Sequence, residues 1–284
     1  MSSFLGILFG IAAMVLWGAA DFFVAKAVRK TSTIKVLFWS QVITLLLSLL
    51  VFFIFFSPPA LSIELIGIIL LCGILSIISW GAFYKGLQIG KVAVVSPIAN
   101  TWPAVTVILS LIFLGETLTL MQGLGVCLAI IGTVLASFKF RDLTKLKNPA
   151  KGAKYALVGL LGWGVMYVFL DILVGSIGWF FPLLFIKIAS VFYLSVYFTA
   201  TKKEFSFPRV ATAFVVLVGA FEMLAAMAYG LGVTYQYTAI IAPIVAGVPM
   251  VTILLARIFF KETVEFNQKV GIVSILAGLV LLAL

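Results

Sequence analysis

The sequence contains no histidine and only two cysteines, Cys72 and Cys127. Histidine is the most common general acid–base and metal-binding side chain, so its absence removes the usual centre of many enzyme sites. Both cysteines lie in apolar runs, where a free thiol behaves as a small hydrophobic group and indicates neither a disulfide framework nor a metal site. No glycine-rich phosphate loop follows a strand. The sequence therefore predicts no enzyme and no cofactor.

Charged residues are also scarce. Asp, Glu, Lys and Arg make up 10% of the 284 residues, whereas 64% are hydrophobic. Almost all of the chain falls into apolar stretches of about 20 residues, the length that crosses a bilayer as a helix, so we expect an all-α integral membrane protein surrounded by lipid. The net charge of +10 could indicate a nucleic-acid partner in a soluble chain. Here Lys and Arg sit at the ends of apolar stretches, which the positive-inside rule explains better than nucleic-acid binding.

The chain contains an internal duplication. Seven residues between Pro97 and Gly132 recur 146 positions later, without a gap. The same offset pairs Trp17-Gly18 with Trp163-Gly164. Such matches indicate an internal repeat rather than an accident of composition. The seven pairs are Pro97/Pro243, Pro103/Pro249, Glu116/Glu262, Thr117/Thr263, Gln122/Gln268, Gly125/Gly271 and Gly132/Gly278.

Ten membrane spans are predicted, five in each half. The first repeat occupies residues 1–138, a basic linker 139–154, and the second repeat 155–284. An odd number of spans in each repeat makes the second enter the membrane from the opposite side. This inverted-topology repeat is typical of secondary transporters, whose binding site lies near mid-membrane between the repeats. The spans are 4–24, 36–56, 64–84, 92–114, 118–138, 155–174, 179–200, 210–232, 239–260 and 266–284.

Lys and Arg gather in the turn after the first span, in the linker 139–154 and in the turn after the seventh span. The turns at 57–63, 115–117, 175–178 and 233–238 contain neither residue. The positive-inside rule therefore predicts a multi-pass protein of the plasma (inner) membrane with cytoplasmic basic loops and both termini on the other side. No basic residue precedes the first apolar run, so we expect a retained helix rather than a signal peptide.

Two charged residues fall inside predicted spans and differ between the repeats. Glu222 takes the position of Ser76, and Lys187 takes the position of Gln41. An unpaired charge at mid-bilayer costs about 2.5–3.5 kcal/mol on insertion scales, and the two residues lie at similar depth, so an ion pair is geometrically possible. One interpretation is a structural pair without a transport role. The other is that Glu222 binds a proton or a cationic group while Lys187 binds a carboxylate, which together suit a zwitterion.

Further candidate substrate-binding residues share helix faces with these positions. A cavity lined by aromatic rings and a carboxylate would also accept a cation. Trp102, Trp179, Tyr235 and Tyr237 fit an interfacial belt instead, and Asp21 lies near a span end, where snorkelling explains it. The further candidates are Trp17, Trp163, Tyr167, Trp80, Tyr84, Ser96, Asn100 and Tyr229.

Four prolines are predicted inside spans: Pro97, Pro103, Pro243 and Pro249. A proline within a membrane helix frees a carbonyl group and bends the helix, so these residues are either hinges for alternating access or static kinks. Glu116 and its repeat partner Glu262 are predicted to be turn or helix-start residues rather than substrate ligands.

The sequence resembles the EamA-type branch of the drug/metabolite transporter superfamily. The resemblance rests on the two Trp-Gly pairs, the spans of Pro97 and Pro243, and the Glu-Thr turns followed by Gln and a glycine-rich span. It implies a cavity between the first four helices of each repeat, with the fifth and tenth helices at the periphery. Similar proteins export amino acids, drugs, nucleotide precursors and other metabolites.

These observations lead us to expect a secondary active exporter of small organic metabolites that works by alternating access, with proton coupling through Glu222 as a hypothesis. Amino acids or related amphipathic solutes are the first substrate class, and organic cations or drugs are the alternative. A non-transporting scaffold or receptor would need a docking surface, which the short loops do not offer. The duplication supplies a pseudo-dimer, so a monomer suffices; a homodimer through the peripheral helices is the alternative.

Overall fold

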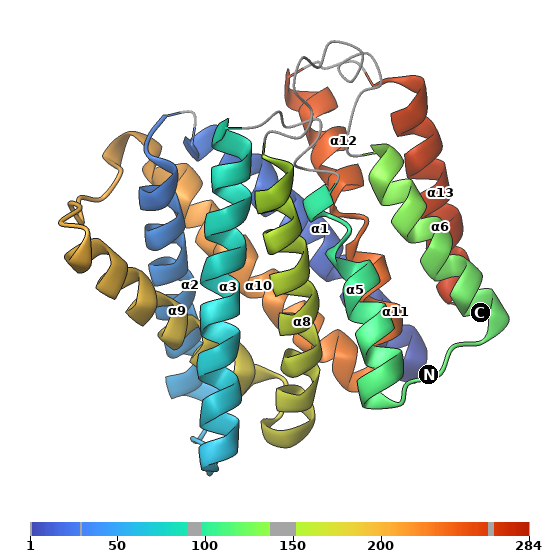
Figure 1. Ribbon diagram of the computed structural model, residues 1–284, viewed down its shortest axis with the longest axis horizontal. Helices are drawn as coiled ribbons and strands as arrows, with labels where there is room; N and C mark the ends of the chain where they lie inside the picture. Colours follow the sequence, from blue (N-terminus) through green and yellow to red (C-terminus); the bar gives the residue numbers. More distant parts are fainter. Residues whose placement is uncertain (1, 29, 90–97, 137–151, 261–263, 284) are drawn as a thin grey trace.

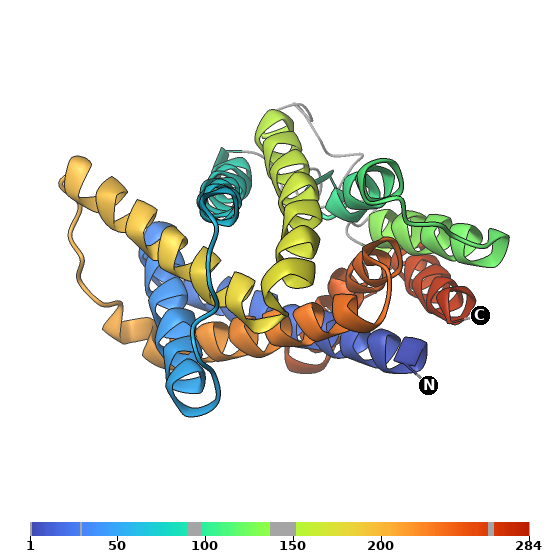
Figure 2. The ribbon, with the colours of Figure 1, turned by 90° about the horizontal axis from the view of Figure 1, so that it is seen from below.

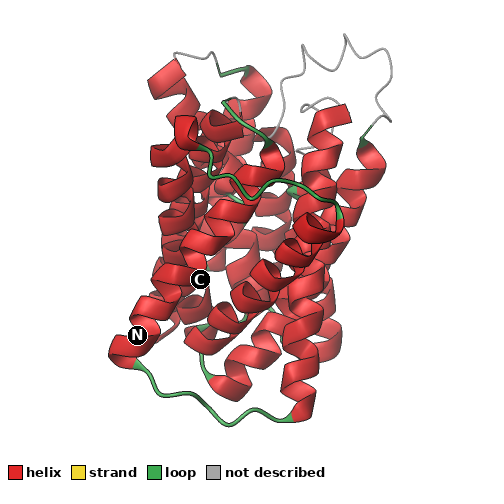
Figure 3. Cartoon of the chain, turned by 90° about the vertical axis from the view of Figure 1, so that its left-hand side faces the viewer, coloured by secondary structure: helices red, strands yellow, loops and turns green. Residues whose placement is uncertain are grey.

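The chain is built from helices. The computed structural model describes residues 2–28, 30–89, 98–136, 152–260 and 264–283, and every regular element in that part is helical (Figure 3). In hydrocarbon, backbone N–H and C=O groups must be satisfied within the protein, and a helix achieves this within one segment. Hydroxyl groups inside the helices bond to a carbonyl one turn earlier in the same way: Ser48 donates to Thr44 O at 2.8 Å and Thr133 to Ala129 O at 2.8 Å.

The helices follow one another in the order shown in Figure 1. The first half forms α1 (Ser2–Val28), α2 (Thr33–Phe55), α3 (Ile63–Ile89), α5 (Trp102–Leu109) with the π-helical turn η1 (Ser110–Leu114), and α6 (Leu120–Ala136). The second half forms α8 (Ala153–Ile177), α9 (Phe180–Ala200), the 3-10 turn η2 (Arg209–Ala211), α10 (Thr212–Tyr235), α11 (Thr238–Val245), α12 (Val248–Phe260) and α13 (Phe266–Leu282).

Seven helical segments of the described chain are long and apolar enough to cross a membrane, which makes this a multi-pass membrane protein. They correspond to α1, α2, α3, α8, α9, α10 and the joined α11–α12. Three shorter apolar helical segments, Trp102–Leu114, Leu120–Ala136 and Phe266–Leu282, overlap the predicted fourth, fifth and tenth spans.

The four prolines lie at different places relative to the helices. Pro103 and Pro249 lie in the first turn of α5 and α12, where the missing N–H and the fixed φ of proline suit a helix start. Pro249 directly follows the break between α11 and α12, and the role of these two residues as hinges or as static kinks stays a prediction. Pro243 does lie inside a helix, α11, which ends two residues later at Val245. Pro97 lies outside the described residues.

Helix packing repeats across the two halves. α1 packs along α10 and α3 packs along α8; a shift of 146 positions relates these two contacts. α2 packs against α9 and α6 against α13, so each of these helices contacts its own counterpart. Figures 1 and 2 show α6 and α13 side by side at one edge of the molecule, with α2 and α9 toward the opposite edge.

Hydrogen bonds between helices repeat at the same offset. The Thr106 hydroxyl donates to Gly164 O at 3.1 Å, and the Thr252 hydroxyl donates to Gly18 O at 3.2 Å. Thr252 is the repeat counterpart of Thr106, and Gly164 is the counterpart of Gly18. The duplicated residues thus make the same contact twice.

Close approach explains why glycine follows tryptophan in both repeats. A Cβ atom added at Gly18 would lie 2.5 Å from Val251 Cβ, and one added at Gly164 would lie 2.5 Å from Val105 Cβ. Val251 lies in α12, which packs against α1, and Val105 lies in α5, which packs against α8. A methyl group on either glycine would push the two packed helices apart. Small residues at such crossings let membrane helices approach closely.

Candidate functional site

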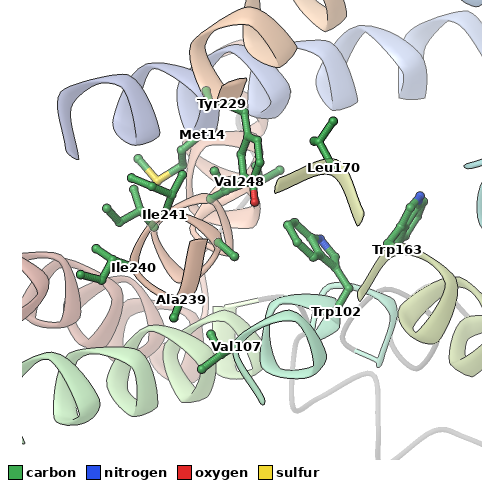
Figure 4. Close-up of a cluster of buried hydrophobic side chains, with 14 of the residues drawn as sticks. Met14, Trp102, Val107, Trp163, Leu170, Tyr229, Ala239, Ile240, Ile241 and Val248 are labelled. Atoms are coloured by element: carbon green, nitrogen blue, oxygen red, sulfur yellow. The ribbon is translucent and has the colours of Figure 1, made fainter. Parts of the chain in front are cut away.

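A cavity of about 120 Å³ lies between the two halves of the chain. Its walls come from α1, α3 and α5 of the first half and from α8, α9, α10, α11 and α12 of the second. Figure 4 labels five of its lining residues: Trp102, Trp163, Leu170, Tyr229 and Val248. Enclosed sites with mostly apolar walls and a few polar groups are the usual form of small-molecule sites.

Lys187 is the centre of a buried polar group beside this cavity. Its Nζ donates to Glu222 Oε1 at 3.0 Å and to Gln41 Oε1 at 2.7 Å. Lys187 and Glu222 are each 8% exposed, and Gln41 is 5% exposed. A buried charge requires such partners, because burying an isolated ion costs several kcal/mol. The ion pair that their similar depth made possible is therefore present, and Gln41 completes it.

Equivalent positions of the two repeats meet at this centre. Gln41 and Lys187 are 146 residues apart and hydrogen-bond to each other. Ser76, the counterpart of Glu222, is also buried and lines the same cavity. The first repeat thus provides neutral side chains where the second provides a cation and an anion.

Asp21 lines the cavity as well. The sequence-based assignment of Asp21 to snorkelling is wrong, because α1 continues to Val28 and places Asp21 one turn beyond Trp17, on the face toward α8 and α10. The charged lining residues are then two carboxylates, Asp21 and Glu222, and one ammonium group, Lys187. The spacing of four residues from Trp17 was the signal that could have identified Asp21.

Aromatic rings form one wall of the cavity. Trp102 stacks on Tyr167 with ring centroids 4.3 Å apart, and Tyr167 contacts Tyr229 at 4.8 Å. Trp17 adds a tilted contact with Tyr229 at 5.8 Å. Trp102 is only 8% exposed, so its prediction as an interfacial residue is wrong. Ring faces carry negative electrostatic potential, and a cluster of them suits a cationic group.

A second pair of rings lies on the α3 side. Trp80 and Trp163 meet edge to face with centroids 4.9 Å apart, and both line the cavity. Asn100 lines it too, from the turn before α5. The side chain of Tyr84 and the residues Ser96 and Pro97 lie outside the part of the chain that the structure describes.

Glu116 was expected to be a turn or helix-start residue, and it does lie in the turn between η1 and α6. Its carboxylate caps a helix of the other repeat, because it accepts the N–H groups of Thr238 and Ala239, each at 2.8 Å, at the start of α11. The Thr238 hydroxyl donates to Asp171 Oδ1 at 2.6 Å. Burial raises the pKa of Glu116, the two N–H groups lower it, and nearby Asp171 raises it further, with a net upward shift. Its counterpart, Glu262, lies outside the described residues.

Comparisons with known proteins agree with the duplication and with the helical fold. The EamA-like transporter family matches residues 4–138 and again 150–284. An uncharacterized protein of Methanocaldococcus jannaschii is 30% identical over 131 residues, which cover 46% of this chain and 95% of that protein. That protein therefore corresponds to about one repeat. A solved crystal structure superposes with a TM-score of 0.80 over 98% of both chains at 16% identity, which supports the fold alone.

Family members are membrane transporters of the drug/metabolite transporter superfamily, and the match covers both repeats of this sequence. The chain belongs to the EamA-like transporter family.

Proposed function

We propose that this protein is a secondary active transporter that exports small amphipathic metabolites bearing an amino group, with amino acids as the first substrate class. The observation that carries the proposal is the cavity between the repeats, where Lys187, Glu222 and Asp21 lie among aromatic rings. Substrate would bind there, and movement of the two repeats against each other would open the cavity first to one side of the membrane and then to the other.

The proposed architecture is ten membrane helices in two inverted five-helix repeats. The counterpart contacts α1–α10 and α8–α3 support it, as does the bond between the equivalent residues Gln41 and Lys187. Under the positive-inside rule, the basic loops face the cytoplasm of a plasma (inner) membrane and both termini face the other side.

A zwitterion matches the polar groups of the cavity. An ammonium Nζ has three N–H donors, and Lys187 directs two of them at Gln41 and Glu222. The third donor is available for a substrate carboxylate. Asp21 and the ring faces of Trp17 and Tyr167 would hold the amino group of the same molecule.

Organic cations are a second candidate substrate class. The cavity has one more carboxylate than ammonium among its described lining residues, and Glu222 is already paired with Lys187. A substrate that is a cation and has no carboxylate would then bind to Asp21 and neutralise its charge. Such a substrate would need no contact with Lys187.

The proposal is tested in proteoliposomes that carry a proton gradient and a pH-sensitive dye. Amino acids and a panel of organic cations are presented one at a time, and the rate of the pH change is measured against concentration. We expect a saturable response to amino acids that is lost in Glu222→Gln, because Glu222 would carry the coupled proton. Glu64→Gln is the matched control, since Glu64 is an exposed carboxylate at the start of α3.

The outcomes separate the alternatives. A response to cations but not to amino acids replaces the first substrate class with the second. A response that survives Glu222→Gln refutes proton coupling through Glu222 and leaves Lys187 and Glu222 as a structural pair. No response to any compound contradicts the proposed substrate classes.

A further inference from the structure

A second, larger cavity of about 550 Å³ lies among α2, α3 and α9, away from the cavity between the repeats. Its floor is apolar, with Leu37 from α2, Ile77 from α3 and Leu194 from α9. The hydroxyl residues Thr31 and Ser32 precede α2 at its rim. An apolar floor beneath a polar rim suits a ligand with both kinds of surface.

Two lysines contribute to the rim of this cavity. Lys85, on the last part of α3, and Lys203, just after α9, both line it. Lys203 Nζ donates to the Tyr197 hydroxyl at 2.8 Å and lies 4.8 Å from the centre of the same ring. Both lysine side chains are exposed, and no carboxylate is among the described residues that line the cavity. The rim therefore favours an anion.

The duplication supplies an internal comparison for this cavity. The counterparts of Lys85 and Lys203 in the other repeat are Leu231 and Ser57, so the corresponding region has neither cation. Aromatic rings lie there instead: Phe180, the counterpart of Ile34, stacks on Phe56 with centroids 4.2 Å apart. The fold thus does not require an open basic cavity at this position.

We propose that the cavity among α2, α3 and α9 binds the headgroup phosphate of an anionic phospholipid. Lys85 and Lys203 would bind the phosphate, and the hydroxyl groups of Thr31 and Ser32 would donate to its oxygens. Basic pockets between membrane helices, at the end with the basic loops, are the sites where such headgroups bind.

The surroundings favour a lipid phosphate over a free phosphate ion. Two helices that line the cavity, α3 and α9, also carry exposed apolar side chains: Ile78 is 50% exposed, Phe192 60% and Val196 49%. In a bilayer this surface contacts acyl chains. A phospholipid can occupy the rim with its headgroup and cover this surface with its chains, whereas a free phosphate gains nothing from the apolar residues.

The test is native mass spectrometry of the protein in a neutral detergent, titrated with phosphatidylglycerol or with phosphatidylcholine of the same acyl chains. We expect phosphatidylglycerol to bind at least tenfold more tightly than phosphatidylcholine. Each lysine near an anionic lipid contributes about 1 kcal/mol, so Lys85→Gln combined with Lys203→Gln should weaken phosphatidylglycerol binding by about 30-fold. The control combines Lys202→Gln with Lys269→Gln, which removes the same charge at exposed positions outside the cavity.

Three results would overturn the proposal. Equal binding of the two lipids would show that the anionic headgroup is not recognised. Equal weakening in the control variant would show a general effect of net charge rather than a site. Displacement of phosphatidylglycerol by glycerol 3-phosphate at matched concentration would identify a free-phosphate site. Unchanged thermal unfolding of both variants verifies that each comparison is made on folded protein.

Discussion

The two repeats place different chemistry on the same scaffold. At the centre, the first repeat contributes Gln41 and Ser76, both neutral, where the second contributes Lys187 and Glu222, which form an ion pair at 3.0 Å. In α1 it is the first repeat that carries the charge, because Asp21 takes the position of the neutral Tyr167 in the second repeat. All six side chains are buried or half-buried. Charge at these positions is therefore not a requirement of the fold.

Positions that match between the repeats have another role. Gly18 and Gly164 each allow a close helix crossing, and Thr252 and Thr106 each donate a hydrogen bond to the carbonyl of one of these glycines. Matched residues thus build the framework, while unmatched residues give the cavity its charge. Substitutions at the two kinds of position should therefore have different consequences.

Removal of the cation should have the largest effect on stability. Lys187→Met leaves Glu222 and Gln41 buried without their donor, and breaking a buried ion pair from one side costs about 3–5 kcal/mol. We expect a marked loss of thermal stability in detergent. The matched variant Lys187→Met with Glu222→Gln makes both positions neutral, as in the first repeat, and should recover most of the loss.

This comparison has a clear opposite outcome. If the double variant is as unstable as Lys187→Met alone, packing of the lysine stem rather than charge pairing stabilises the centre. The neutral centre of the first repeat would then be a poor guide to the second.

Adding a methyl group at the matched glycines should have the next largest effect, equal in the two repeats. Gly18→Ala and Gly164→Ala each place a Cβ 2.5 Å from a valine Cβ, and overpacking of this kind costs about 1–3 kcal/mol. Gly123→Ala in α6 is the control, because nothing lies within 4 Å of its added Cβ. Unfolding in detergent measures all three. A large loss in only one of the matched pair would show that the repeats differ in packing as well as in charge.

The repeat pattern made much of the framework predictable from sequence. Matched rare residues located the two halves, and the length of the apolar runs located most helices. Pro243 and Pro249 predicted a bend in the ninth span, but not the residues at which the span divides into α11 and α12. The division falls at Ala246-Gly247, where a Cβ added to Gly247 would meet Met14 and Ile275, a contact between distant parts of the chain.

The cavity was only partly predictable. Glu222 and Lys187 stood out because a charge inside an apolar span needs a partner. Asp21 and Trp102 did not, because an acidic residue near a span end and a tryptophan beside a turn also fit interfacial positions. Their places beside the cavity depend on how α1 packs against α10 and α5 against α8, which a single sequence does not encode locally.

Asp21→Asn should weaken substrate binding with little effect on stability. Asp21 supplies the unpaired carboxylate of the cavity, so its removal should raise KM for a substrate with an ammonium group by about tenfold, or about 1.4 kcal/mol. Asp171→Asn is the control, because Asp171 is not among the cavity-lining residues and its Oδ1 acceptor for Thr238 is retained. Initial transport rates in proteoliposomes give KM. An equal change in both variants would assign the effect to the overall charge of the protein.

The smallest effect should be a pH dependence at Glu116, where the first repeat caps a helix of the second. Burial raises the pKa of this carboxyl above its ordinary value of 4.5, so the folded state favours the protonated form. The stabilisation is then fully present below pH 4.5 and is lost as the pH rises through the folded-state pKa. Glu116→Gln lacks this titration, so the stability of the wild type relative to the variant, measured by unfolding, should fall as the pH rises. A wild type that instead gains stability relative to the variant as the pH rises would mean that the N–H groups of Thr238 and Ala239 outweigh burial. The ionised carboxylate would then be the form that holds α11.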